Sequence, residues 1–176
     1  MPNDRRFEEL VLPHLDAAYN LARWLLRNDH DAQDAVQEAC VRAWRAFDRY
    51  RGGDSRAWLL TIVRNVCYTH LRKSRREPGI EEFSDESHGT SEALAETKAG
   101  EWLEAKSEAL HEALERLPAE FREVIVLHEI EGLPYREIAM VADIPIGTVM
   151  SRLARARRKL QIELREPTPK ETSHGL

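Results

Sequence analysis

Residues 133–152 read LPYREIAMVADIPIGTVMSR, and they have the form of a helix-turn-helix. Pro134 suits the start of the first helix because proline is tolerated in a first helical turn. Ala139 is small enough to let a second helix cross closely, and residues 143–145 supply the turn. We therefore predict two helices here, the second starting at Ile146. Because helical spacing recurs along the whole chain and strand signals are nearly absent, we expect an all-α fold.

The helix that begins at Ile146 is predicted to have one apolar and one basic side. Its inward positions are Val149, Leu153, Ala156 and Leu160. Such a helix can read base edges with its N-terminal side chains and hold phosphates with later cations. The alternative is an ordinary amphipathic helix with a solvated basic face. The candidate duplex-binding residues on the outer side are Thr148, Ser151, Arg152, Arg155 and Lys159.

A second basic stretch, 56–76, holds six basic residues and no acidic one. It follows a predicted loop at 48–54, and its helical pattern turns Leu59, Ile62, Val63 and Val66 inward. The opposite side is polar, basic and partly aromatic, which suits stacking on unpaired bases and contact with the strand backbone. For Trp58 a place in the core is an open alternative. The candidate residues for single-strand binding are Arg56, Trp58, Arg64, Asn65, Tyr68 and Arg72.

The remaining helices are predicted from apolar periodicity. We expect one helix over Arg5–Asn28 and another up to about Phe47, whose N-cap lies in 29–31. The apolar stripe of the second is predicted as Val36, Cys40, Ala43 and Phe47, and its polar side carries Asp34, Gln37 and Glu38. Further helices are expected from near Gly100 to Leu117 and over Ala119–Glu131, with Gly132 as a C-terminal cap.

The net charge of −5 over 176 residues conceals an uneven distribution. Residues 1–76 hold 14 Lys and Arg against 10 Asp and Glu, whereas 77–107 hold 2 against 9. Residues 108–134 hold 2 against 7, and 135–176 hold 8 against 5. We therefore predict two small helical domains, 1–76 and 108–166, joined by a flexible acidic linker at 77–107 and followed by a tail at 167–176. The linker itself is not expected to fix the orientation of the domains.

Several classes of protein are disfavoured by the sequence. No apolar stretch is long enough to span a membrane, and the charged start does not resemble a signal peptide, so we expect a cytoplasmic protein without membrane insertion. Cys40 and Cys67 form no CxxC pair, and although Cys67 and His70 lie one helical turn apart, two ligands are too few for a metal site. No catalytic constellation is visible, so we predict no enzyme, no cofactor and no metal.

Three further stretches carry a family resemblance. Residues 31–45 read DAQDAVQEACVRAWR, 57–66 read AWLLTIVRNV, and 114–124 read LERLPAEFREV ahead of the helix-turn-helix. In this order and spacing they resemble regions 2.2, 2.3 to 2.4 and 4 of the extracytoplasmic-function group of bacterial sigma factors, the promoter-recognition subunits of RNA polymerase. The resemblance covers nearly the whole chain. One departure is THLR at 69–72, where family members often have Asp-Tyr-Leu-Arg, which leaves the specificity of this helix end open.

The resemblance implies a set of partners. Region 2 would bind the β′ clamp helices of core RNA polymerase through Asp34, Gln37 and Glu38, and the melted −10 element through the 48–56 loop with Asn65 and Tyr68. Region 4 would bind the β flap and the −35 duplex, and an anti-sigma factor would regulate the chain. Two other classes remain open. One is a sigma-like decoy or adaptor that binds an anti-sigma factor, and the other is a helix-turn-helix repressor.

Overall fold

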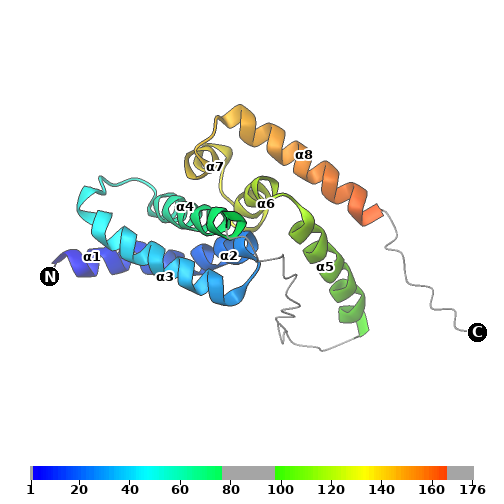
Figure 1. The fold of residues 1–176 in the computed structure, drawn as a ribbon, viewed down its shortest axis with the longest axis horizontal. Helices are drawn as coiled ribbons and strands as arrows, with labels where there is room; N and C mark the ends of the chain where they lie inside the picture. The colour runs from blue at the N-terminus through cyan, green and yellow to red at the C-terminus, as the bar shows by residue number, and fades with distance from the viewer. Residues whose placement is uncertain (1, 77–97, 166–176) are drawn as a thin grey trace, which may run out of the picture.

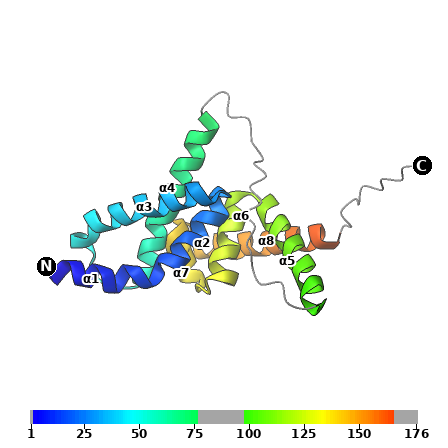
Figure 2. The same cartoon turned by 90° about the horizontal axis from the view of Figure 1, so that it is seen from below.

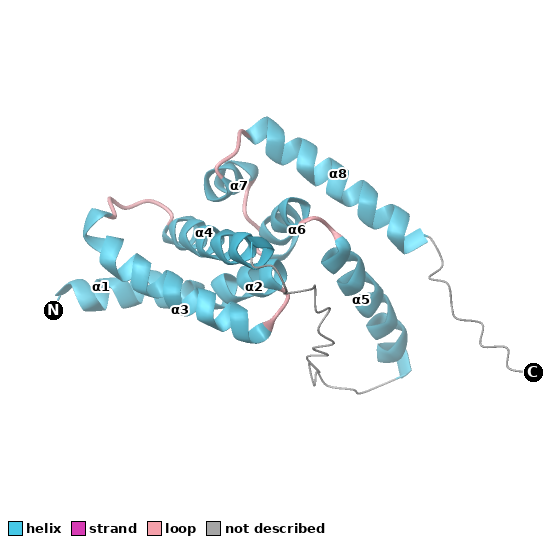
Figure 3. Ribbon diagram, in the orientation of Figure 1, coloured by secondary structure: helices cyan, strands magenta, loops and turns pink. Residues whose placement is uncertain are grey.

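The computed structural model describes residues 2–76 and 98–165, and every regular element within those ranges is a helix (Figures 1 and 3). Residues 77–97, within the predicted linker, and the predicted tail at 167–176 lie outside the described residues. Helix α5 begins at Lys98, so the last part of the range predicted as linker is helical. We refer to residues 2–76 as the N-terminal half and to residues 98–165 as the C-terminal half.

The N-terminal half opens with three helical segments where the sequence predicted one. They are α1 (Pro2–Val11), the 3₁₀ turn η1 (Leu12–His14) and α2 (Leu15–Leu26). Pro13 lies within η1, and because proline lacks a backbone N–H and crowds the preceding turn, the prediction of one continuous helix was wrong. Helix α2 ends at Leu26, and its C-cap residue Arg27 has a left-handed φ of 57°.

Helices α3 (Asp29–Ala46) and α4 (Ser55–Arg76) complete this half, with the 3₁₀ turn η2 (Phe47–Arg49) between them. The N-cap of α3 is Asn28, not residues 29–31 as predicted, and its side chain accepts a hydrogen bond from the Asp31 N–H at 2.9 Å. The predicted apolar stripe of α3 is also shifted, because Val36 and Cys40 are only half-buried. The buried stripe consists of the small residues Ala32, Ala35, Ala39 and Ala43.

The C-terminal half holds α5 (Lys98–Arg116), α6 (Ala119–Ile125), the short π-helical segment η3 (Val126–Ile130), α7 (Tyr135–Ala142) and α8 (Ile146–Arg165). The predicted helix-turn-helix is confirmed as α7 and α8. Gly132 has the predicted role after η3, with a φ of 69° and an N–H that donates to the His128 carbonyl at 3.1 Å.

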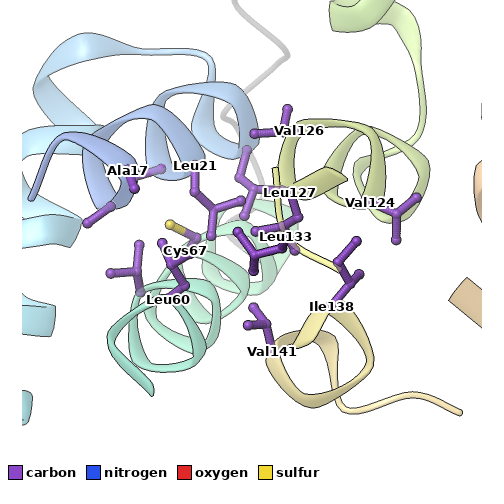
Figure 4. Close-up of a cluster of buried hydrophobic side chains, with 14 of the residues drawn as sticks. Ala17, Leu21, Leu60, Cys67, Val124, Val126, Leu127, Leu133, Ile138 and Val141 are labelled. Atoms are coloured by element: carbon purple, nitrogen blue, oxygen red, sulfur yellow. The ribbon is translucent and has the colours of Figure 1, made fainter. Parts of the chain in front are cut away.

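The two halves pack directly against each other. Figure 4 shows α2 and α4 side chains such as Leu21 and Leu60 meeting Leu127, Leu133 and Ile138 of the C-terminal half. These side chains belong to one continuous buried cluster, and each of them is fully buried. The sequence predicted two domains separated by a linker but did not predict this shared core. In Figure 2 the last turns of α4 project away from the other helices.

Arg122 forms a polar joint beside this core. Its Nη1 donates to the carbonyls of Leu117 at 2.7 Å and Glu115 at 3.0 Å, and its Nη2 donates to the carbonyl of Leu25 at 3.3 Å. These carbonyls lie at or just beyond the C-terminal ends of α5 and α2, where backbone acceptors lack partners within the helix. Burial lowers the pKa of Arg122 to about 10, which still leaves the guanidinium charged at neutral pH.

Candidate nucleic-acid interface

The helix-turn-helix presents the polar side of α8 outward. Asp143 fixes the turn with a left-handed φ of 54°, and the Ile144 N–H donates to the Ala139 carbonyl at 3.0 Å. Ser151 and Arg155 are exposed on the outer side, as predicted. An exposed polar helix at this place in a helix-turn-helix suits entry into a major groove. The inward positions are buried as predicted: Val149, Leu153, Ala156 and Leu160.

Three other predicted residues of α8 lie at the edge of this face. The Arg152 guanidinium Nη2 lies 3.9 Å from Glu120 Oε2, and the Lys159 Nζ lies 5.1 Å from the ring centre of Phe121. Both partners belong to α6, and Thr148 is half-buried. These contacts place Arg152 and Lys159 on the flank of α8 that borders α6.

Sequence reasoning missed Arg158. It is exposed and lies seven residues after Ser151, which is two helical turns along the same line of α8. Its neighbour Arg157 is directed to the other flank, where Nη2 donates to Glu129 Oε1 at 2.6 Å. The helical period could have predicted this exposed position, because residue 158 lies opposite the inward residues of α8. The cations at the centre of the outer face are therefore Arg155 and Arg158.

The basic side of α4, in contrast, faces the C-terminal half. Arg64 Nε donates to Glu123 Oε1 at 2.6 Å, and the Tyr68 hydroxyl donates to Glu123 Oε2 at 2.9 Å. The Arg64 guanidinium also lies 4.1 Å from the centre of the Tyr68 ring. Glu123 is fully buried, and the Arg64 side chain is only 18% exposed. One carboxylate of α6 thus binds two of the residues predicted to capture single-stranded DNA.

This cluster keeps its donors protonated. Burial alone lowers the pKa of Arg64, but the hydrogen bond and the negative charge of Glu123 outweigh it, so the net shift is upward. Burial and then the charge of Glu123 raise the pKa of Tyr68. At neutral pH the guanidinium is therefore charged and the phenol is protonated. Both groups satisfy the buried carboxylate, which would be costly without partners.

Arg56 makes a further polar contact between the halves. Its Nη1 donates to the Glu131 carbonyl at 3.1 Å, and its Nη2 lies 3.6 Å from Glu137 Oε2. Glu137 also meets Asp54, whose carboxylate caps α4 by accepting from the Ala57 N–H at 3.1 Å. The hydrogen bond between the two carboxyl groups raises the pKa of Glu137 and lowers that of Asp54. One of the two carboxyl groups must be protonated to make this hydrogen bond, so the contact between Asp54 and Glu137 is favoured at low pH.

The other predicted α4 residues have different surroundings. Trp58 is half-buried, with its ring centre 4.9 Å from that of Tyr50 and 6.3 Å from that of Phe47. It belongs to an aromatic cluster beside the 50–54 loop, so it has both a core role and a partly open side. Asn65 and Arg72 are exposed. The structure does not bring all six candidates to one open surface.

The polar side of α3 is open to solvent. Asp34 and Gln37 are exposed, and Glu38 accepts hydrogen bonds from Arg42 Nη2 at 2.6 Å and from His70 at 3.3 Å. The hydrogen bond with His70 is the largest cause of the lowered pKa of Glu38.

Sequence reasoning missed two apolar residues beside this trio on α3. Val41 is 45% exposed and Trp44 is 47% exposed. The signal was their spacing, because Gln37, Val41 and Trp44 follow one another at helical intervals of four and three. Exposed apolar side chains rimmed by charged ones are typical of a protein-binding surface.

Burial disfavours the thiolate form of both cysteines. Cys67 is buried in the core as predicted, and burial raises the pKa of its thiol to about 12. Burial also raises the pKa of the half-buried Cys40. Within the described ranges, no three His, Cys, Asp or Glu side chains gather as a metal-binding group. No helix in those ranges is long and apolar enough to cross a membrane.

Comparison with known proteins assigns the family. Residues 10–77 match the family model described as Sigma-70 region 2, and residues 107–160 match Sigma-70, region 4. The ECF RNA polymerase sigma factor SigE of Mycolicibacterium smegmatis is 35% identical over 161 residues, which are 88% of this chain but 60% of that protein. The RNA polymerase sigma-H factor of Pseudomonas aeruginosa is 34% identical over 175 residues, 92% of this chain and 90% of that protein.

The chain belongs to the ECF family of RNA polymerase sigma factors. A solved relative, the sigma factor RpoE from Bartonella quintana in complex with the anti-sigma factor NepR, matches this sigma factor with a TM-score of 0.74. Its sequence identity is 30%, and the match covers 93% of this chain and 99% of that one. The N-terminal half therefore carries region 2 and the C-terminal half carries region 4. The Glu123 contacts with α4 join region 4 to region 2 in this sigma factor.

Proposed function

We propose that this sigma factor directs core RNA polymerase to promoters and assists opening of the −10 element. It acts in the cytoplasm and performs no bond chemistry. Region 2 binds the β′ clamp helices through the α3 surface of Asp34, Gln37, Glu38, Val41 and Trp44. Region 4 binds the β flap and places the outer face of α8 in the −35 major groove. An anti-sigma factor holds the chain inactive, a proposal supported by the relative that was solved with NepR.

Strand opening follows from differential binding. A protein that binds unstacked bases better than stacked ones shifts the equilibrium toward the open duplex. On α4, Tyr68 and Trp58 offer aromatic surfaces, while Arg56 and Arg64 offer charges for the strand backbone. Base stacking on an aromatic side chain is worth about 1–3 kcal/mol per base. A few such contacts therefore offset the unpairing of several base pairs.

The contacts between the halves give this function an order of steps. We call the arrangement in which the two halves are packed together the closed arrangement. In it Arg64 and Tyr68 bind Glu123, so a DNA strand and Glu123 compete for the same donors. Capture of the −10 strand then requires region 4 to leave α4. The surfaces on α3 and α8 are exposed already and are free to meet their partners first. We infer that polymerase and −35 binding precede release of the α4 face.

The observation that carries the proposal is the presence of both regions in one chain and in the family's order. A helix-turn-helix repressor needs region 4 alone, which would leave the exposed α3 surface without a use. No observation favours a decoy over a sigma factor.

The deciding experiment is transcription in vitro with core RNA polymerase and a library of genomic fragments. The proposal expects specific starts that depend on this chain. A decoy would bind an anti-sigma factor yet give no starts, and a repressor would only reduce starts made by another sigma factor. Trp44→Ala should weaken binding to core enzyme, whereas Leu12→Ala, an equally exposed apolar residue in η1, should not. Equal binding by both variants would contradict the α3 assignment.

A further inference from the structure

Two exposed apolar side chains lie in the first turns of α8, on the line that continues to Arg157 rather than at the centre of the outer face. Ile146 is 42% exposed and Met150, one turn later, is 51% exposed. The inward side of α8 is filled without them by Val149 and Leu153. A single exposed apolar residue needs no explanation by itself. Its position matters here, because the N-terminal turns of a recognition helix are the part that contacts base edges.

The polar neighbour Ser151 is partly committed to its own helix. Its hydroxyl donates toward the carbonyls of Gly147 at 3.1 Å and Thr148 at 3.2 Å. In this state the hydroxyl keeps acceptor capacity for a base but has no further proton to donate. Arg152 is turned toward Glu120, as described above. The side chain most available to the groove in these two turns is therefore Met150.

The chemistry of methionine restricts what Met150 can recognise. Its side chain has no N–H or O–H donor, and its thioether is only a weak acceptor. The base edges in the major groove are donors and acceptors, with one apolar exception, the C5 methyl group of thymine. Methionine is also flexible enough to adapt its end to such a group.

We propose that Met150 selects thymine in the −35 element by packing on the thymine C5 methyl, with Ile146 bordering the same contact. This inference rests on the proposed function and names a specificity determinant within it. Removing one buried methyl group corresponds to about 0.8 kcal/mol, which is about fourfold in affinity.

The test removes that methyl group alone. Duplexes are selected from a random pool by the full chain with core polymerase, and each thymine of the selected element is replaced in turn by deoxyuridine. For the wild-type chain we expect one or two replacements to weaken binding about fourfold. Met150→Ala should bind the thymine duplex about fourfold more weakly and should no longer distinguish thymine from deoxyuridine. Met150→Leu should keep the discrimination, because it keeps an apolar end.

Met140→Ala is the matched control. Met140 is 53% exposed but lies on α7, so this variant should discriminate like the wild type. The proposal is overturned if no thymine replacement affects the wild type, if Met150→Ala retains the discrimination, or if no duplex is selected. Failure of the proposed function would give a different result: duplexes would be selected and Met150 would discriminate thymine from deoxyuridine, but no transcription would start.

Discussion

The two helices proposed to bind DNA, α4 and α8, have similar sequences in outline but opposite environments. Each has an apolar side and a side rich in polar and basic residues. On α8 that side is exposed, with Arg155 and Arg158 in solvent. On α4 it is largely covered, with Arg64 and Tyr68 bound to a buried Glu123. A basic helix side thus predicts a charged partner, but it does not say whether that partner is DNA or another part of the chain.

The charge distribution explains the difference. The basic stretch at 56–76 faces the acidic stretch at 108–134, which supplies the Glu123 carboxylate. The stretch around α8 has no acidic residue from Ile144 to Ile162, so its outer cations remain available. Some of the acidic side chains therefore pair with basic side chains inside the molecule and do not lie on its surface.

The largest expected effect comes from opening α4. Glu123→Gln removes the charge that pairs with Arg64, and breaking a buried ion pair on one side costs about 3–5 kcal/mol. We expect the two halves to separate, which small-angle X-ray scattering would record as a larger radius of gyration. Binding to a single-stranded −10 oligonucleotide should strengthen because Arg64 and Tyr68 become free.

The control for this experiment is Glu129→Gln, which removes an exposed partner of Arg157 and should change neither measurement. Helical content from circular dichroism shows whether each variant is folded. A folded Glu123→Gln variant with unchanged size and unchanged strand binding would show that Glu123 does not hold the halves together.

The second effect concerns the open face of α8. Arg155→Ala should cost about 1–3 kcal/mol on the cognate −35 duplex if Arg155 makes a bidentate base contact, and much less on unrelated DNA. Arg158 lies one turn later, where a phosphate contact is expected. Arg158→Ala should weaken binding to all duplexes similarly and reduce the salt slope by about one. Equal losses on all sequences for both variants would make Arg155 a backbone contact as well.

The smallest effect is a pH dependence of closure. The pKa of Glu137 is raised by its hydrogen bond with Asp54, so its contribution to the closed arrangement is present in acid and is lost as pH rises through the raised pKa. The pKa of Asp54 is lowered, so its opposite contribution is lost only when pH falls through that lower value.

We therefore expect scattering to show tighter closure as the pH is lowered from neutral through the raised pKa of Glu137. Glu137→Gln should be closed at neutral pH without this trend, because an amide donates to Asp54 without an added proton. The change should stay within about 1 kcal/mol for such a partly exposed pair. A pH trend that persists unchanged in Glu137→Gln would assign it to other groups.

Much of the fold could be predicted from local patterns. The helix-turn-helix followed from proline, turn and apolar spacing in one continuous stretch, and α7 and α8 begin next to or at the predicted positions. The errors are also local in origin. Pro13 divides the first helix, and the stripe of α3 was shifted because alanine gives a weaker hydrophobic signal than Val36 or Phe47 although it packs more closely.

The contact between the halves could not be predicted in this way. Arg64 and Glu123 lie 59 residues apart in sequence, and Asp54 meets Glu137 across a longer span. Periodicity identifies which side of a helix is polar, but it holds no information on what that side meets. The charge map contained the complementary signs of 56–76 and 108–134, and it lacked only their proximity.

Arg122 is bound unequally to the two halves that it connects. Two of its three hydrogen bonds go to carbonyls at the end of α5, in its own half, and the one to Leu25 is the longest at 3.3 Å. When the halves part, the guanidinium therefore stays behind as a finished cap for α5, while water takes its place on Leu25 at the exposed end of α2. At this joint, closing again requires only the Leu25 hydrogen bond to be remade, because the end of α5 keeps its cap.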